Sequence, residues 1–454
     1  MRRIQLSDHF TLSTLLLFAL PSIGMEIVDN TYQIADGYFI SNFISESAFE
    51  AENLIFPPLL IVVSVGLMFG SGASALISRE LGEGRKEMAG RMLSMILSVL
   101  FLIGVVLSAA LYFLMPRVAV WVGATPEMVP DCVTYGRILS FFMPFQMLSM
   151  AFHPLLITAE RPGLGLGTTI ANAAANILLD WLFVAVFRWG MAGAAFATGL
   201  AWTVSAVIPF CYFLNRRHPL HFATPCRDLR ALGQAVYNGS SEMVSAISYA
   251  IVALIINLQL LRWLGGDGVA AYAVCEYVSG LFYAVFYGIG MSLVPVVGYQ
   301  LGRKDVSELR SLRRVSLTLT GLLGLVQTLL SLALADPIVR IFVGYNEGLT
   351  ALSVHALRIV SLSFLLGGIT TCSSSYFTGL NQGTFSLAVA AMKGFLAPLA
   401  MIFLLPLLMG STGLWVSTPA AEVLTLLLAV FFFLRWKKRE DSGDLPEPDP
   451  EAAG

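Results

Sequence analysis

The stretch GMAGAAFAT at residues 190–198 decides the fold, because its pattern recurs 220 residues later as GSTGLWVST at residues 410–418. Both copies have a glycine, a second glycine three residues on, and a threonine five residues after that. Other short motifs recur at nearly the same offset: Leu81-Gly82 as Leu301-Gly302, and Arg137–Ser140 as Arg358–Ser361. The repeats indicate an internal duplication, which is common among membrane proteins built from two bundles.

The composition places both copies in a membrane. Hydrophobic residues make up 57% of the 454 residues and charged residues 12%, and the mean hydropathy is +0.77. Long apolar runs recur along the chain, and each is long enough to cross about 30 Å of hydrocarbon as a helix. We therefore predict an all-α integral membrane protein with 12 transmembrane helices, at roughly residues 11–40, 53–77, 91–114, 131–158, 164–187, 190–213, 231–261, 268–299, 312–334, 350–378, 385–409 and 412–434.

These spans group into two lobes of six helices. The N-lobe is expected at residues 1–213 and the C-lobe at residues 231–436, joined by a basic cytoplasmic linker at residues 214–230. The tail at residues 437–454 is largely acidic and rich in proline, so we expect it to be disordered. If both termini lie inside, 20 of the 27 lysine and arginine residues fall on the inner side and six at outer helix ends. This asymmetry favours cytoplasmic termini in the cell membrane and an even number of spans.

Two spans carry stripes of polar residues, which are expensive in lipid and usually functional. The polar positions step by three or four residues, so each stripe follows one helix face. The stripes are Glu26, Asp29, Gln33 and Asp36 in the first span, and Asn172, Asn176 and Asp180 in the fifth. Lipid satisfies neither stripe, so each needs the other or water. For Glu26 and Asp29, local capping or pairing remains an alternative to a role in ion or substrate binding.

The depth of these side chains follows from the helical rise of about 1.5 Å per residue. Asp180 lies ten residues before the outer turn at Gly190, and Thr198 lies eight residues after it. The predicted cation-coupling pocket contains Asp36, Asn176, Asp180 and Thr198, with Gln33 one turn before Asp36. Carboxylate, amide and hydroxyl oxygens are hard ligands that suit Na⁺, and neighbouring buried carboxylates also carry protons. The residues alone leave Na⁺ and H⁺ open.

The C-terminal half is polar at other positions. The residues that match Asn176 and Asp180 by the repeat offset are Leu396 and Ala400. The ion site is therefore expected in the N-lobe alone.

The C-lobe acids have other candidate roles. Glu242 in the seventh span is a second carrier site, a binding group for a cationic substrate, or a solvated acid near the inner end. Glu276 in the eighth span is a further candidate for contact with the substrate. Lys393 and Glu422, in the last two spans, are expected to form a structural ion pair.

Four stretches of the chain carry a further signal. They are Pro21–Ser41 with Asp36 before an aromatic-rich turn, Asn176–Asp180 followed by Gly190–Thr198, Pro295–Gly302, and Gly410–Trp415 with Pro419 and Glu422. Together they resemble the multidrug and toxic compound extrusion (MATE) family, in its prokaryotic Na⁺- or H⁺-coupled form, over residues of about 10 to 435. Gln33 stands where many members have asparagine, and Lys393 where a related subgroup usually has arginine.

The resemblance implies two six-helix lobes related by a pseudo-twofold axis around a central cleft. It implies a secondary antiporter that exports organic cations in exchange for inward Na⁺ or H⁺, by alternating access between the lobes. It also implies that Asp36, Asn176, Asp180 and Thr198 form the N-lobe cation site.

Other functions compete with this interpretation. A flippase of a lipid-linked or other amphiphilic substrate is the main alternative, and it would be favoured by spans rich in arginine and lysine. No HExxH sequence, nucleophile elbow or histidine cluster supports an enzyme, and no glycine-rich filter repeat supports a channel. We expect small organic cations and the bilayer as partners, no nucleic acid, no cofactor beyond the coupling ion, no structural metal, and a monomer.

Pro21 is expected to be a hinge, because proline removes one backbone hydrogen bond and kinks a helix; a fixed kink is the alternative. Pro21→Ala should restore that bond and stiffen the first helix. Cation binding at Asp36 and Asp180 should then survive while turnover of the transported substrate falls. Paired binding and transport assays on the purified variant measure this. Transport at the parental rate would exclude bending at Pro21 from the cycle.

Overall fold

The computed structural model describes the backbone of residues 4–442, with every side chain except those of Gln33, Asp441 and Ser442. In this range the chain is helical throughout, without strands. The elements are α1 (Leu12–Phe43), α2 (Glu46–Gly82), α3 (Lys86–Trp121), α4 (Val129–Thr158), α5 (Pro162–Asp180), η1 (Trp181–Val186), α6 (Gly190–Leu214), α7 (Leu229–Gly302), α8 (Val306–Val343), α9 (Glu347–Val360), η2 (Ser361–Ser363), α10 (Phe364–Gly379), α11 (Gly383–Ala391), η3 (Met392–Leu396), α12 (Ala397–Met409) and α13 (Thr412–Ser442).

Eleven helical segments in the described range are long and apolar enough to cross a membrane. The predicted count of twelve differs because the seventh and eighth expected spans both lie within the 74-residue helix α7. This helix folds back on itself at Gly265, whose φ of 69° and ψ of −157° are not helical. The Tyr249 hydroxyl donates to Glu276 Oε2 at 2.9 Å, although 27 residues of straight helix would separate them by about 40 Å. The two arms of α7 are therefore antiparallel.

The duplication is visible in the backbone turns. Three residues with left-handed φ angles in the N-terminal half have left-handed counterparts at the repeat offset. The pairs are Gly84 with Lys304, Glu160 with Asn381, and Gly190 with Gly410. Gly190 and Gly410 have φ angles of 60° and 62°, a region that glycine occupies without steric cost. The glycine motif at residues 190–198 and 410–418 thus marks the same turn in both halves.

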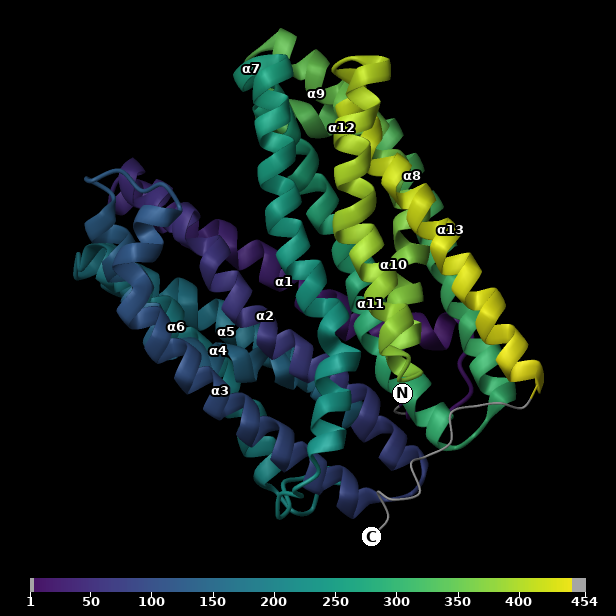
Figure 1. Ribbon diagram of the computed structural model, residues 1–454. Coiled ribbons are helices and arrows are strands. Elements are labelled where there is room, and N and C mark those ends of the chain that lie inside the picture. The colour runs from purple at the N-terminus through teal and green to yellow at the C-terminus, as the bar shows by residue number, and fades with distance from the viewer. Residues whose placement is uncertain (1–3, 443–454) are drawn as a thin grey trace.

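The helices form two groups (Figure 1). One contains α2 to α6 and the other contains α7 to α13. The groups lie together near the end where α13 finishes and diverge toward the end where α7 bends. We call these the terminal end and the far end.

Helix α1 connects the two groups. Its first half packs in a buried cluster with α7, α10 and α13, in which Phe18 lies with Leu293 and Phe377. Ser292 Oγ donates to Ser22 Oγ at 2.8 Å in the same region. The second half crosses to the N-terminal group (Figure 1). The expected N-lobe therefore has its first helix packed partly on the C-lobe.

The start of α8 is defined by a side-chain cap. Asp305 Oδ1 accepts from the Glu308 amide at 3.0 Å and begins α8. The Ser307 hydroxyl also donates to this carboxylate, and the two bonds hold the pKa of Asp305 below its usual value.

Near the C-terminus, α13 runs on to Ser442 through the first residues of the expected tail, and residues 443–454 lie outside the described range.

Helices α2 and α7 approach each other closely through glycines. A β-carbon on any of these glycines would meet a carbonyl oxygen of the facing helix. The facing pairs, glycine first, are Gly72 with Ala235, Gly239 with Met68, Gly82 with Tyr299, and Gly302 with Arg79. The contact between the groups therefore depends on the absence of side chains at these positions.

Gly239→Ala should destabilise the contact between α2 and α7, because the added methyl meets the Met68 carbonyl. We expect a loss of about 1 to 3 kcal/mol in stability, typical of overpacking. Gly233→Ala is the matched control, since no atom lies within 4 Å of its β-carbon position. Thermal unfolding in detergent measures both variants. Equal melting temperatures would contradict the close packing at Gly239.

Candidate functional site

Two carboxyl groups from distant parts of the chain meet in the N-terminal group. Asp36 lies in the second half of α1, and Asp180 is the last residue of α5. The Asp36 carboxyl lies near the Asp180 carboxyl and the Thr198 hydroxyl, close enough for these groups to act on its charge. Asp36 is 5% exposed and Asp180 is fully buried. The structure thus brings together two acids that the sequence analysis assigned to one pocket.

Amide groups extend the site along α5. Asn176 lies one turn before Asp180, and its Nδ2 donates to Thr198 Oγ1 on α6 at 3.3 Å. Asn172 lies one turn further back and is also buried. The oxygens Asn172 Oδ1 and Asn176 Oδ1 have no donor. All four residues of the predicted cation pocket are therefore neighbours, whereas the Gln33 side chain lies outside the described part of the chain.

The backbone changes at Asp180. Directly after this residue, α5 gives way to the π-helical turn η1. Such turns are rare and are frequent at functional sites. The π-helical turn η1 therefore begins directly after Asp180 and leads into the loop before Gly190.

Glu52 is a third acid at this site, and sequence reasoning missed it. It lies on α2, and its carboxyl is near enough to the Asp36 carboxyl for each charge to act on the other. The Tyr135 hydroxyl of α4 donates to Glu52 Oε1 at 3.3 Å. The expected second span began at residue 53, whereas α2 begins at Glu46. The available signal was the capping serine Ser45, whose hydroxyl accepts from the Ala48 amide at 3.0 Å.

The chemistry of this cluster follows from its missing partners. Asp36 Oδ1 and both carboxylate oxygens of Asp180 are buried without a hydrogen-bond partner. Among the described residues, no lysine or arginine forms an ion pair with Asp36, Glu52 or Asp180. Buried charges without partners are strongly unfavourable. The cluster is therefore suited to take up protons or a hard monovalent cation.

The geometry is that of a row, with Asp36 in the middle. Within the described residues, no three His, Cys, Asp or Glu side chains converge as a cage for a metal ion. A cation bound here would use one or two carboxylates together with the amide oxygens of α5 and the Thr198 hydroxyl.

A second group of acids lies between the two groups of helices. Asp29 on α1 and Glu242 on the first arm of α7 are near enough to act on the charge of Glu26. The phenol of Tyr287 feels the charges of Glu26, Glu242 and Glu276. Glu276 accepts from the Tyr249 hydroxyl. Three of the four predicted substrate-side acids, Glu26, Glu242 and Glu276, are therefore near enough to act on the phenol of Tyr287, and Asp29 lies near Glu26.

The C-lobe contains a buried ion pair, as predicted. Lys393 Nζ lies 3.1 Å from Glu422 Oε1. Thr370 donates to Glu422 Oε2 at 2.6 Å and Tyr283 donates to Oε1 at 2.9 Å. The ammonium also donates to the Gly367 carbonyl at 2.9 Å. Both charges of this pair are fully partnered, unlike the acids of the N-lobe.

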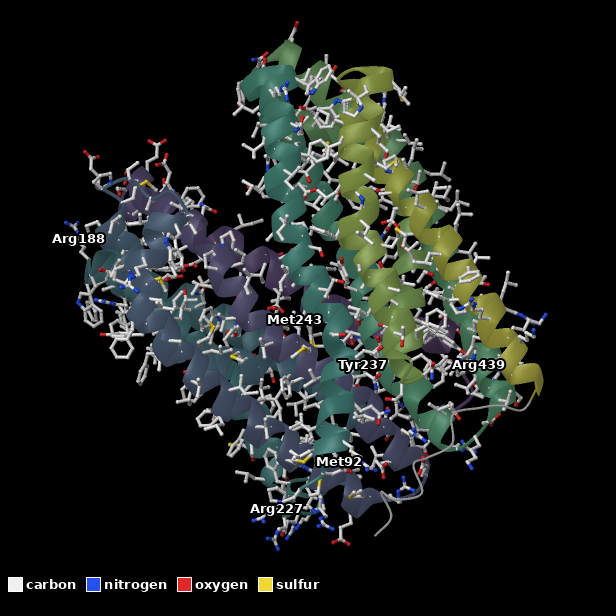
Figure 2. All side chains as sticks on the ribbon, in the orientation of Figure 1. Met92, Arg188, Arg227, Tyr237, Met243 and Arg439 are labelled. Carbon is white, nitrogen blue, oxygen red and sulfur yellow. The ribbon has the colours of Figure 1, made fainter. Side chains whose placement is uncertain are left out.

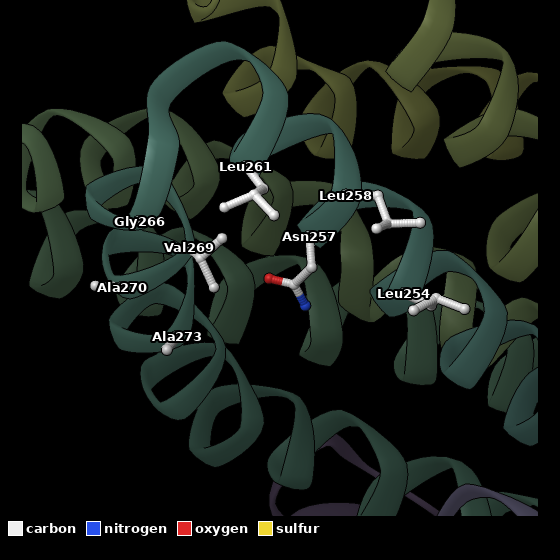
Figure 3. Close-up of a pocket in the computed structure, with 8 residues that line it drawn as sticks. All are labelled: Leu254, Asn257, Leu258, Leu261, Gly266, Val269, Ala270 and Ala273. Carbon is white, nitrogen blue, oxygen red and sulfur yellow. The ribbon is translucent and has the colours of Figure 1, made fainter. Parts of the chain in front are cut away.

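A separate pocket of about 470 Å³ opens between the two arms of α7, near the bend (Figure 3). Residues between Leu254 and Leu261 form one wall and residues between Gly266 and Ala273 form the other. Asn257 is its polar member, and its Nδ2 donates to the Ala253 carbonyl of the same helix. The pocket offers apolar surface and no charged group.

A duplicated, multi-pass helical bundle with unpaired acids buried in one half defines a membrane transport protein. The chain belongs to the MatE family, whose profile matches residues 21–182 and 242–404.

Known proteins resemble the chain over nearly its whole length. It is 24% identical to the Probable multidrug resistance protein YoeA of Bacillus subtilis (strain 168), covering 93% of this chain and 94% of that protein. It is 21% identical to the Multidrug export protein MepA of Staphylococcus saprophyticus, covering 95% of each. A crystal structure of MATE in complex with MaL6 superposes with a TM-score of 0.89 at 19% identity, covering 97% of this chain and 99% of that one. This likeness confirms the all-helical MATE fold.

Lys393→Met should leave the Glu422 carboxylate buried without its cation. Breaking a buried pair from one side costs about 3 to 5 kcal/mol. The double variant Lys393→Met/Glu422→Gln should recover most of that stability, because Tyr283 and Thr370 still find an acceptor. Melting temperatures in detergent test this, with Lys86→Met at an exposed position as the control. A single variant as stable as the parent would show that the pair is dispensable.

Proposed function

We propose that this protein is a secondary antiporter that exports organic cations in exchange for inward Na⁺ or H⁺. The observation that carries the proposal is the buried row of acids at Asp36 and Asp180, which has oxygens but no cation of its own. Such a site changes its charge state when an ion binds or leaves, and this is the requirement for coupling. The relatives named as multidrug resistance and multidrug export proteins support the same direction of transport.

The substrate class is proposed from the acids between the lobes. Glu26, Asp29 and Glu242 lie together, and Tyr287 lies near them. Carboxylates attract a positive charge, and an aromatic face adds a cation–π contribution of about 0.5 to 2 kcal/mol. These groups disfavour an anionic lipid-linked substrate, for which a basic surface would be expected.

The orientation is proposed from the positive charges. Arg227 and Arg439 lie toward the terminal end, and Arg188 lies toward the far end (Figure 2). Because lysine and arginine concentrate on the cytoplasmic side, we assign the terminal end to the cytoplasm of the cell membrane. The lobes meet at that end, so the structure corresponds to a state open to the outside.

Alternating access would then depend on ion binding at the N-lobe. A ligand shifts an equilibrium between two conformations only by its difference in affinity for them. Neutralising the buried acids removes their mutual repulsion, which biases the packing of α1 against α5. Substrate release to the outside and ion entry from the outside are thereby linked in one cycle, with the monomer as the working unit.

The test is transport of ethidium in proteoliposomes with Na⁺ and H⁺ gradients imposed separately. Asp180→Asn should abolish gradient-driven transport, and Asp36→Asn should do the same, because each removes a charge that the ion must neutralise. Asp267→Asn, at an exposed position in the bend of α7, is the matched control and should transport normally. Near-normal coupled transport by both site variants, at equal reconstitution, would remove this site from the mechanism.

A further inference from the structure

Glu52 lies at the same depth as Asp36, on the neighbouring helix. Asp36 is seven residues before the end of α1 at Phe43, and Glu52 is six residues after the start of α2 at Glu46. At about 1.5 Å per residue, both lie about 10 Å from the turn that joins the helices. That turn is at the far end, as Figure 1 shows. Glu52 therefore lies beside Asp36 on the neighbouring helix, at the same distance from the far end.

The three acids form a graded row from the surface to the interior. Glu52 is partly exposed, Asp36 is 5% exposed and Asp180 is fully buried. Asp36 is near enough to both of the others for their charges to act on one another, and Asp180 also feels the charge of Glu52. The exposed fraction of the side chains thus falls from Glu52 through Asp36 to Asp180.

The partners of the three acids differ along the row. Glu52 has one fixed donor, the Tyr135 hydroxyl at 3.3 Å. Both oxygens of Asp180 have no partner, and the buried amide oxygens of Asn172 and Asn176 beside it have none. Unpartnered buried oxygens mark the inner end as the place where a cation is finally held. The outer end is hydrogen-bonded and open to water, as suits a first point of contact.

We propose that Glu52 is the entry station of the coupling-ion path, holding the incoming monovalent cation between itself and Asp36 before the ion passes to Asp36 and Asp180. The inference rests on the proposed ion-coupled function. The negative charge of Glu52 lowers the free energy of a partly dehydrated cation at the mouth of the site. Its place outside the inner pocket means that it affects how readily the ion loads, and not whether a loaded protein can turn over.

The experiment compares Glu52→Gln with Glu50→Gln, an exposed acid two residues away on the same helix. Ethidium transport in proteoliposomes is measured against external Na⁺, with choline as the replacement, and separately against external pH without Na⁺. The gradient that drives ethidium transport by the parental protein, Na⁺ or H⁺, identifies the coupling ion. Melting temperature against the same ion gives a second readout that does not depend on transport, because a ligand that binds only the folded state stabilises it once its concentration exceeds the dissociation constant.

Glu52→Gln should raise the ion concentration for half-maximal transport by about tenfold or more, since a neighbouring opposite charge is worth one to three orders of magnitude in ion affinity. The maximal rate should stay within about twofold of the parent. The ion concentration above which the melting temperature begins to rise should increase by a similar factor. Glu52→Asp, which keeps the charge, should recover most of the affinity and shows that the variants are compared as folded proteins.

Two outcomes would overturn the entry station while leaving the proposed function intact. One is a half-saturating ion concentration in Glu52→Gln equal to that of Glu50→Gln. The other is a loss of transport at every ion concentration, as in Asp180→Asn, which would make Glu52 part of the inner pocket. A parental protein that ignores both gradients, with Asp180→Asn unchanged, would instead overturn the proposed function itself.

Discussion

The structure depends on how two buried acidic centres obtain a positive charge. In the C-lobe, Glu422 receives it permanently from Lys393 at 3.1 Å, and hydroxyl groups satisfy its remaining lone pairs. In the N-lobe, Asp180 has neither a basic partner nor a donor for its two oxygens. A carboxylate in that position is stable only when a cation or a proton joins it. The first centre is neutralised within the protein, whereas in the proposed function the second is neutralised by an ion from solution.

The duplication explains why both centres exist on one scaffold. The left-handed turns at Gly190 and Gly410 set equivalent loops in the two halves. By the same offset, Trp202 and Glu422 occupy matching positions, so divergence placed an indole where the other half has its acid. The two halves therefore share a backbone arrangement and differ in whether a residue of the chain supplies a positive charge to the buried acid. One half pairs its buried acid with a lysine of its own, whereas the other half leaves Asp180 without a basic partner among the described residues.

Much of this arrangement followed from the sequence. The long apolar runs, the repeat, and the equal depth of Asp180 and Thr198 around Gly190 depend on local periodicity and helical rise, which a single sequence reveals. Glu52 was missed because its role depends on where α2 begins, and the seven residues from Glu46 precede the most apolar run. The fusion of two spans in α7 and the crossing of α1 between lobes arise from tertiary packing, for which the sequence pattern has no local sign.

In the proposed mechanism, the path of α1 connects ion binding at Asp36 to the packing of the two lobes. Its first half is buried against α7, α10 and α13, while its second half carries Asp36 among the helices of the N-lobe. Pro21 lies next to Ser22, at the contact with Ser292 of the C-lobe. A change of charge at Asp36 therefore acts on a helix whose other half is anchored in the opposite lobe. Because the close glycine contacts between α2 and α7 allow little sliding without separation, the proposed mechanism links movement of α1 to opening at the terminal end.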